Sequence, residues 1–432
     1  MNISAYPALL GVGYICGTRV SATLFAGSVL SWLVLIPLIC LFGADTILYP
    51  GTRTISQMWV TGGASSIWSS YIRYIGAGAV ATGGIISLIK SLPLIVSTFK
   101  ESLKGLMGVK GQKASTERTS REIPMNVIII SVIAIAVFIA LVPAIPVGIV
   151  GAVIIIVCGF FFATVASRIV GLVGSSNSPV SGMTIATLLI TTFVFKMTGN
   201  DGIAGMTSAM AVGSVIAIIA AISGDTSQDL KTGYIVGATP MKQQIGEIIG
   251  VVVSAIAIGG VLYLLDAAWG FGSEQLSAPQ ATLMKMIVEG VMGGNLPWNL
   301  VFVGVFIAIV VELLGISVMS FAIGIYLPIE TTACIMIGGV LRAVVEKKKY
   351  KNTEEKDITV NKGILACSGM IAGEGLVGIL LAIFAIIPLG AGTIGEAINL
   401  SSLVNFGSIG TLVIFAAMII LVLKTTIWSK KN

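Results

Sequence analysis

The chain has 432 residues, of which 56% are hydrophobic and only 10% are charged, and its formal net charge is +6 at pH 7. Soluble globular proteins carry roughly 25% charged residues, so most of this protein's surface must face something other than water. Disordered chains are polar and rich in charge, so the same composition excludes disorder. Because about 20 apolar residues span the hydrocarbon core, the chain has room for about ten crossings. The composition predicts an all-α, polytopic integral membrane helix bundle that forms a single transmembrane domain over residues 1–432.

Several classes of function are excluded by what the sequence lacks. It contains no histidine, which removes HExxH metalloprotease motifs, Ser-His-Asp triads and metal sites built on imidazole. The cysteines lie singly in apolar stretches without a CxxC pair, so neither a metal knuckle nor a disulfide framework is indicated. No Walker A sequence is present, and the basic residues fall in short runs between apolar segments. We therefore expect no bound metal, no cofactor, no nucleic-acid partner and no enzymatic activity.

Continuous apolar runs predict the membrane segments in chain order. The 52 glycines, many of them inside these runs, predict close packing of helix backbones where the bilayer provides no hydrophobic drive for association. The first 17 residues are apolar but interrupted by Pro7 and by glycines, which favours an interfacial or half-crossing segment. The predicted spans are Ser21–Phe42, Ile67–Phe99, Pro124–Val142, Pro146–Val165, Val180–Lys196, Ile203–Ile222, Ile245–Leu265, Trp298–Leu314, Ile316–Leu341, Ile364–Pro388 and Ser408–Thr426.

The distribution of Lys and Arg predicts the orientation. Basic residues are concentrated in the linkers Lys100–Arg121 and Arg342–Lys362 and in the C-terminal tail, so all three should be cytoplasmic and the protein should lie in the cytoplasmic membrane. The linker Asp266–Pro297 is acidic and should be external. Seven apolar runs separate the two basic linkers, and an odd number of crossings would place the linkers on opposite sides. Both linkers can be cytoplasmic only if one of these runs enters the membrane and returns to the same side. The best candidate is Ile316–Leu341, because the segment Gly324–Glu330 contains helix-breaking residues.

The first candidate functional segment is the polar stretch from Gly171 to Thr184. Its glycines and Pro179 favour non-helical backbone, and Asn177 and Ser181 offer neutral hydrogen-bonding groups. A helix that begins near Gly182 would direct its free N–H groups toward a ligand, as the discontinuous helices of secondary transporters do. An ordinary polar turn explains the composition equally well.

The second candidate is the segment Ser223–Gln244, which we expect to be a linker between spans. Its polar residues include Asp225, Gln228, Asp229 and Lys231. These side chains could form ion pairs that close a cytoplasmic gate, or they could simply lie on a solvated linker. The composition favours the solvated linker.

Three acids lie inside apolar runs and form the third candidate set. Glu312, Glu330 and Glu374 should face the bundle interior, form pairs or stay protonated, because a charge at the bilayer centre costs about 3 kcal/mol even on insertion scales. Arg73 is a possible cationic partner, as are Lys90 and Lys196. Since the chain has no histidine, carboxylates are the only plausible proton carriers. Glu374, between two glycines, is the best candidate because helices and substrate could approach it.

Several blocks of this sequence resemble the oligopeptide transporter (OPT) superfamily, which includes the Yellow Stripe-like metal-chelate transporters. The block "QDLKTGY" is similar to that family's signature, and the other blocks are "SSNSPVSGMTIATLL", "LPWNLVFVGVFIAIVVELLGI", "FAIGIYLPIETT" and "SGMIAGEGLVG". The resemblance implies secondary active, usually proton-coupled, uptake of small peptides or peptide-like metal chelates. The resemblance assigns the broken-helix block to Asn177, Pro179, Ser181 and Gly182. It assigns the signature segment to Asp225, Gln228, Asp229 and Lys231, and the acid of the last block to Glu374.

Members of this family are usually longer and contain more predicted segments than this chain. We therefore expect that the N-terminal part of the family's domain is missing. A metal-chelate transporter is the alternative within transport. A different alternative is a truncated membrane subunit that does not transport by itself and needs a partner segment or a homo-oligomer.

Overall fold

A computed structural model describes residues 6–108, 117–173, 180–273, 276, 278–293, 297–390, 392–399 and 407–427. The described part is almost entirely helical, which confirms the predicted all-α membrane fold. Within it, seven helical segments are long and apolar enough to cross a membrane, and two shorter apolar helices accompany them. Their outward surfaces carry many exposed aliphatic side chains, for example Ile130 and Ile256. Such a surface is stable against lipid, so the chain is an integral membrane protein.

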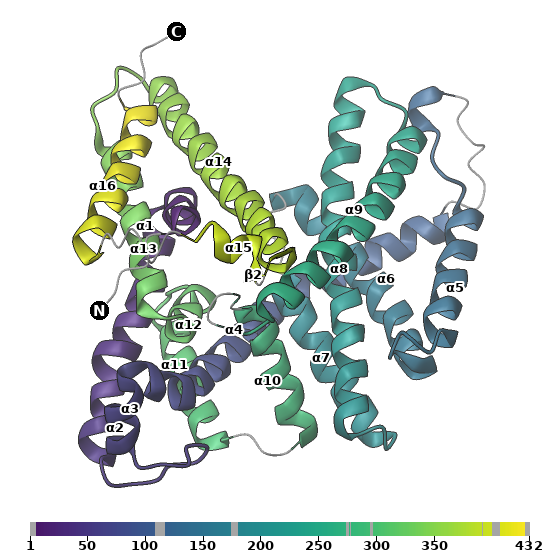
Figure 1. Ribbon diagram of the computed structural model, residues 1–432. Helices are drawn as coiled ribbons and strands as arrows, with labels where there is room; N and C mark the ends of the chain where they lie inside the picture. The colour runs from purple at the N-terminus through teal and green to yellow at the C-terminus, as the bar shows by residue number, and fades with distance from the viewer. Residues whose placement is uncertain are drawn as a thin grey trace. The chain divides into compact units, whose positions relative to one another are not determined.

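The helices follow one another with short connections (Figure 1). The strands β1 and β2 pair antiparallel in a short hairpin between α14 and α15. The elements are α1 (Pro7–Val29), the π-helical turn η1 (Leu30–Leu35), α2 (Ile36–Gly43), α3 (Ile55–Ile67), the π-helical turn η2 (Trp68–Ile72), α4 (Arg73–Gly108), the 3-10 turn η3 (Arg118–Ser120), α5 (Met125–Leu141), α6 (Gly148–Val173), α7 (Val180–Met197), α8 (Gly202–Val236), α9 (Pro240–Trp269), α10 (Pro279–Gly293), α11 (Trp298–Leu313), α12 (Val318–Tyr326), α13 (Ile329–Lys347), α14 (Thr353–Ile386), β1 (Pro388–Leu389), β2 (Gly392–Thr393), α15 (Ile394–Ala397) and α16 (Gly407–Thr426).

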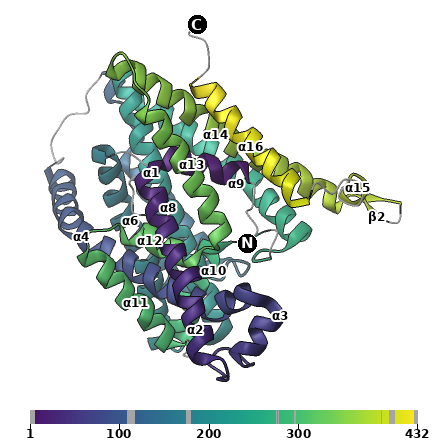
Figure 2. The same ribbon diagram turned by 90° about the vertical axis from the view of Figure 1, so that its left-hand side faces the viewer.

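The chain forms two compact units, which are described separately. Unit 1 comprises residues 1–80, 260–279 and 297–432, and unit 2 comprises residues 81–259 and 280–296. In unit 1, α1 lies along α12 and α13 (Figure 2). A Cβ atom added to Gly324 would overlap the backbone of Leu24, and one added to Gly338 would overlap the carbonyl of Leu10. Glycine therefore allows these helices to touch backbone to backbone, as the sequence predicted.

The first helix of unit 1 begins earlier than predicted. Residues from Pro7 onward are helical up to an interruption at Gly17, beyond which the helix continues through the span predicted from Ser21. The helix is kinked at Gly17, whose φ of 82° lies in the left-handed region that favours glycine. Near the kink, the Ser21 hydroxyl donates to the Gly13 carbonyl at 3.2 Å.

Unit 2 is built on α6, α7 and α8, whose apolar faces form a core around Phe162, Val165, Met183 and Ile216. The predicted external linker Asp266–Pro297 is not a simple linker, because it contains α10. Leu283 and Val288 of this helix are buried. The short amphipathic run within the linker was too polar to be read as a span, although it supplies apolar side chains to unit 2.

The segment Ser223–Gln244 was expected to be a linker, and this expectation is wrong for most of its length. Helix α8 continues through the segment to Val236 and ends at Gly237, which has left-handed backbone. Contacts with α6 stabilise this extension: Gly224 packs against Val170, and the Ser227 hydroxyl donates to the Ser167 carbonyl at 3.0 Å. Polar residues without proline can remain helical when a neighbouring helix packs against them.

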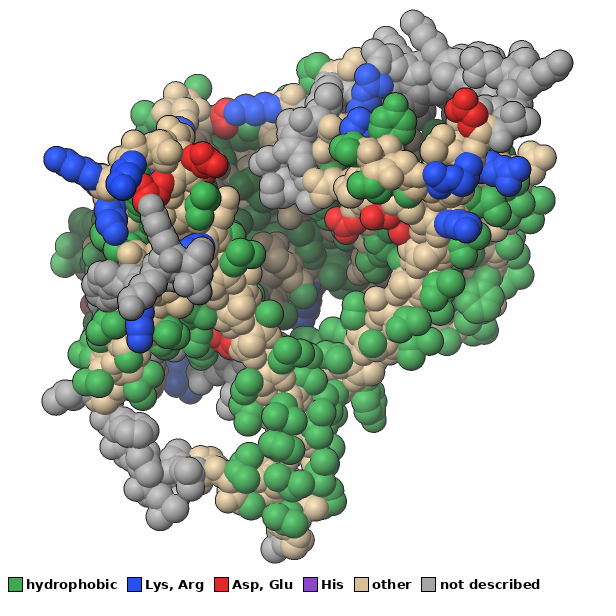
Figure 3. Space-filling view, turned by 90° about the horizontal axis from the view of Figure 1, so that it is seen from above, with side chains coloured by type: hydrophobic (Ala, Val, Ile, Leu, Met, Phe, Trp, Pro, Cys, Tyr) green, Lys and Arg blue, Asp and Glu red, His purple; other side chains and the backbone are tan. Residues whose placement is uncertain are grey.

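The basic connections lie together at one end within each unit. In unit 2, Arg118 donates to the Gly237 carbonyl at 2.8 Å and to the Thr239 hydroxyl at 3.0 Å, which joins the α4–α5 connection to the α8–α9 turn. In unit 1, Val345, Val360 and Val422 share one core cluster, so the α13–α14 connection lies beside the end of α16. Figure 3 shows Lys and Arg side chains in separate groups, with Asp and Glu side chains among them. The membrane side of these ends stays a prediction.

Candidate functional site

A pocket in unit 2 lies between α7, α8 and α10. Its volume is about 290 Å³, near the lower end of the range of roughly 300–1,000 Å³ that is typical of ligand sites. The polar groups that line it are neutral, and no charged side chain lines it. They come from Ser181, Thr184, Ser214 and Gln280. The pocket can therefore offer hydrogen bonds to a ligand without imposing a charge.

The start of α7 forms one wall of this pocket. Val180 is its first helical residue, and the first N–H groups of any α-helix have no partner within the helix. Gly182 is buried, and a Cβ atom there would lie 3.4 Å from the Gly84 carbonyl of α4. Ser181 lines this pocket, and its role in substrate binding stays a prediction. Asn177 and Pro179 lie outside the described residues.

The signature residues do not line the pocket. Asp225, Gln228, Asp229 and Lys231 are exposed on α8, whereas the last pocket-lining residue of that helix is Ala217. At 1.5 Å per residue, Asp225 lies about 12 Å farther along the helix.

Contacts of the signature segment hold it to the start of α9. Gln243 donates to the Asp229 carbonyl at 3.1 Å and to its carboxylate at 3.3 Å, and Lys231 lies 5.1 Å from the centre of the Tyr234 ring. Within the described chain, these signature residues form no ion pair of the kind expected for a charged gate. Glu247 was not among the residues predicted from the sequence. It lies beside Asp229, and its Oε1 is buried without a hydrogen-bond partner.

In unit 1, the predicted break within Gly324–Pro328 is present. Helix α12 ends at Tyr326, Leu327 is extended, and α13 begins after Pro328. Pro328 has no N–H to donate to the Gly324 carbonyl four residues earlier. The buried Ser28 hydroxyl of α1 donates to that carbonyl instead, at 2.6 Å.

A second hydroxyl completes the arrangement at the break. The Thr332 hydroxyl of α13 donates to the Ser28 oxygen at 2.7 Å, and both residues are fully buried. A hydroxyl relay from α1 thus replaces the hydrogen bond that the proline removes. The proposed return of Ile316–Leu341 to its starting side stays a prediction.

Glu330 and Glu312 lie at helix ends in unit 1. Glu330 is half-buried in the first turn of α13, where the helix dipole favours a negative charge. Glu312 is half-buried in the last turn of α11. Neither side chain lines a described pocket.

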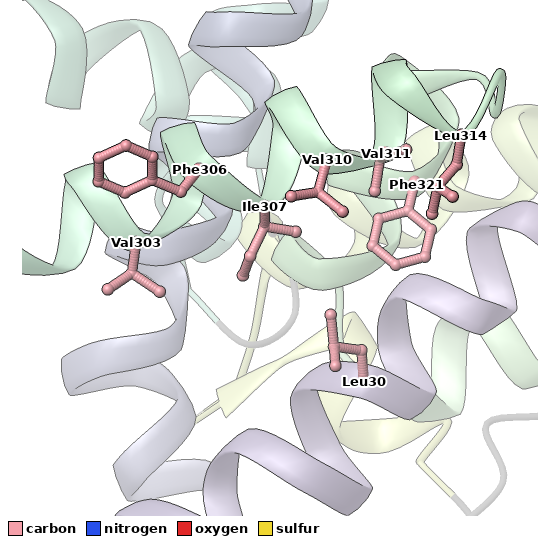
Figure 4. Close-up of a pocket in the computed structure, with 8 residues that line it drawn as sticks. All are labelled: Leu30, Val303, Phe306, Ile307, Val310, Val311, Leu314 and Phe321. Atoms are coloured by element: carbon pink, nitrogen blue, oxygen red, sulfur yellow. The ribbon is translucent and has the colours of Figure 1, made fainter.

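A groove lies along α11 next to Glu312, and all the side chains that line it are apolar. Figure 4 shows Leu30 facing α11 and α12 across this groove, whose volume is about 480 Å³. The groove offers no polar side chain that could bind a peptide bond.

Glu374 lies on α14 and contacts the start of α1. Its Oε2 accepts a hydrogen bond from the Ala8 backbone N–H at 2.6 Å. Cys334 of α13 is nearby and donates to the Tyr6 carbonyl at 3.6 Å. A Cβ atom on Gly373 or on Gly375 would meet nothing within 4 Å, so α1 contacts the Glu374 side chain and does not pack on these glycines.

An aromatic cluster around Arg73 was also missed by the sequence analysis. The Arg73 guanidinium lies 5.4 Å from the Trp68 ring centre and 5.9 Å from that of Tyr326, and Trp32 stacks on Trp68 at 6.2 Å. In the described chain, Arg73 pairs with no carboxylate, so the predicted pairing with a buried acid is not present. The sequence signal was an arginine close to a tryptophan inside an apolar run. This signal indicates a cluster only once the fold brings the ring of Tyr326 near Arg73 as well.

Discontinuous helices such as α12 and α13 occur in secondary transporters. The fold itself defines a helical integral membrane protein. The chain belongs to the OPT family: the family model described as "OPT oligopeptide transporter protein" matches residues 1–385. The resemblance seen in the sequence blocks is confirmed.

Two relatives support the assignment. The chain is 30% identical to a "Putative oligopeptide transporter" of Haemophilus influenzae, over 98% of this chain and 73% of that protein. It is 24% identical to the "Putative oligopeptide transporter YGL114W" of Saccharomyces cerevisiae, over 40% of this chain and 26% of that protein. No solved structure gives a significant match.

Proposed function

We propose that this protein is a secondary active transporter that carries small peptides across the cytoplasmic membrane together with protons. Membership of the OPT family supports transport, and the names of both relatives support oligopeptides as the substrate class. The proposal assigns substrate binding to the pocket in unit 2 and proton binding to Glu374 in unit 1.

The observation that carries the peptide assignment is the neutral polar lining of the pocket. Every peptide bond presents one N–H donor and one C=O acceptor. The hydroxyls of Ser181, Thr184 and Ser214 can donate or accept, and the Gln280 amide can do both at once. Such a lining can bind the backbone of peptides that differ in their side chains, while apolar neighbours such as Met210 and Met284 contact side chains.

The coupling assignment rests on the contact between Glu374 and Ala8. A hydrogen bond to an ionised carboxylate is roughly twice as strong as one between neutral groups, and the N-terminal end of a helix also attracts a negative charge. Protonation of Glu374 would weaken its hold on the start of α1. Because α1 packs along α12 and α13, the same event would favour movement of the broken helices. This gives a route from proton binding to a conformational change.

Transport in proteoliposomes tests the proposal. Purified protein is reconstituted, and uptake of labelled peptides of two to five residues is measured with an inward proton gradient, with no gradient and with an outward gradient. A peptide-like metal chelate forms a separate arm. We expect peptide accumulation only with the inward gradient, and exchange of internal for external peptide without any gradient. Uptake of the chelate but not of peptides would overturn the substrate class, and accumulation that ignores the gradient would overturn the coupling.

A further inference from the structure

The cluster of Trp32, Trp68, Arg73 and Tyr326 combines a cation with unused hydrogen-bond donors. The guanidinium of Arg73 lies near the faces of two aromatic rings, and its Nη2 donates weakly to the Tyr326 hydroxyl at 3.5 Å. The Nε of Arg73 and the indole nitrogens of Trp32 and Trp68 are buried and have no hydrogen-bond partner. Buried donors are normally satisfied, so three unpaired donors around one cation require an explanation.

The acceptor they lack is not supplied by the described protein. Arg73 forms no ion pair with any Asp or Glu in the part of the chain that the structure describes, and its only polar partner there is Tyr326. An arginine presents five N–H donors in a planar fork that matches a carboxylate. The indole N–H groups of Trp32 and Trp68 add two further donors beside the guanidinium, because a cation–π contact involves the face of a ring and not its N–H. The arrangement is therefore complementary to a small anion.

The depth of the cluster argues against a lipid headgroup as this anion. Trp32 lies in the π-helical turn η1, eleven residues before the end of α2 at Gly43. At 1.5 Å per residue this is about 16 Å, inside the apolar segment Pro7–Gly43 that is long enough to cross a membrane. Trp68 lies in η2, thirteen residues after the start of α3 at Ile55. A charged side chain at such depth generally lies on a substrate or ion pathway.

The cluster also adjoins the break between α12 and α13. Tyr326 is the last residue of α12, and Gly76 of α4 packs against it so closely that a Cβ atom would lie 2.8 Å from the Tyr326 Cα. Both π-helical turns contribute a tryptophan, and π-bulges occur frequently at functional sites. A ligand held by Arg73 would therefore contact the end of a discontinuous helix.

We propose that Arg73, Trp32, Trp68 and Tyr326 form, within unit 1, a second site on the transport path, separate from the pocket of unit 2, that binds a carboxylate of the transported substrate. For a peptide this group is the C-terminal carboxylate, and this identification rests on the proposed function. The guanidinium supplies the charge and a fork of N–H donors, the indole N–H groups supply two further donors, and the Tyr326 hydroxyl orients the guanidinium. The site predicts that the protein distinguishes a peptide acid from the corresponding amide.

The test measures binding to the full-length protein in detergent by isothermal titration, with three probes: trialanine, trialanine amide and succinate. The variants are Arg73→Gln, Arg73→Lys and Trp68→Phe, and the matched control is Arg53→Gln, which alters an exposed arginine in the α2–α3 connection. We expect Arg73→Gln to weaken trialanine binding about ten- to a hundredfold, as for loss of hydrogen bonds to a charged group. Binding of trialanine amide should change less than about threefold, since the amide lacks the charge.

The remaining arms separate a carboxylate site from a structural role. Arg73→Lys should restore part of the affinity for trialanine. Trp68→Phe, which keeps an aromatic ring but removes the indole N–H, should weaken trialanine binding more than amide binding. Equal losses for acid and amide in Arg73→Gln would overturn the inference. If wild-type protein binds no peptide, the proposed function fails, and succinate binding that depends on Arg73 would still support a carboxylate site. Absence of any Arg73-dependent binding across the three probes would reject it. If Arg73→Gln does not fold, the acid-to-amide ratio in Trp68→Phe decides.

Discussion

The Glu374 carboxylate on α14 accepts the Ala8 backbone N–H at 2.6 Å, across 366 positions of the chain. Ala8 lies in the first turn of α1, where backbone N–H groups have no partner within the helix. A side chain from a distant helix therefore caps α1 and places a carboxylate at the positive end of its dipole. This contact gives Glu374 a specific role that its position in the sequence did not reveal.

The first prediction concerns Glu374→Gln. The substitution keeps an oxygen that can accept from Ala8 but cannot change charge, so accumulation driven by a proton gradient should be lost. Peptide exchange without a gradient should remain within about threefold of wild type, because the neutral side chain keeps a hydrogen bond of about 0.5–1.5 kcal/mol. Proteoliposome uptake and counterflow measure the two activities. Glu330→Gln serves as the control. Full gradient-driven accumulation by Glu374→Gln would show that Glu374 is not the residue that couples transport to protons.

The second prediction contrasts two glycines. Gly324→Ala places a Cβ atom against the Leu24 backbone and should destabilise the protein by about 1–3 kcal/mol, the usual cost of overpacking. Gly373→Ala adds a methyl group that meets nothing within 4 Å and should leave stability unchanged or slightly raised, because alanine favours helix. Thermal unfolding in detergent, followed by circular dichroism, compares them. Similar melting temperatures for both variants would contradict the packing of α1 on α12.

The third prediction concerns the pocket of unit 2. Ser214→Leu adds a large side chain at the lining and removes a hydroxyl, so it should lower peptide uptake about tenfold or more through steric exclusion. Thr207→Leu makes a comparable change at an exposed site of the same helix that does not line the pocket, and uptake should be retained. Initial rates in proteoliposomes, normalised to inserted protein, provide the measurement. Equal uptake by both variants would remove this pocket from the transport path.

The fourth prediction is topological. Single cysteines at Ser120, Asn200 and Asn352, in a background with the native cysteines replaced by alanine, are labelled with an impermeant maleimide. All three positions are exposed. Ser120 and Asn352 belong to the basic connections and should react only from the cytoplasmic side. Asn200, in the turn between α7 and α8, should react only from the outside, and labelling of all three from one side would contradict the predicted orientation.

The sequence alone determined the class of this protein and much of its segmentation. Apolar runs define membrane helices because the bilayer selects for length and hydrophobicity, which are local properties. The break at Leu327–Pro328 was also predictable, since proline lacks an N–H wherever it lies. The continuation of α8 to Val236 was not, because its polar residues are held helical by contacts with α6.

Only the tertiary structure decided which groups meet. Local sequence patterns cannot pair Glu374 with Ala8, Ser28 with the Gly324 carbonyl, or Arg73 with Tyr326, because each pair is separated by more than 250 positions. The pocket likewise needs α10, which lies in a stretch predicted to be an external linker. Side-chain hydrogen bonds and cation–π contacts depend on distances of a few ångströms between helices, and those distances are set by how glycine-lined backbones pack rather than by local composition.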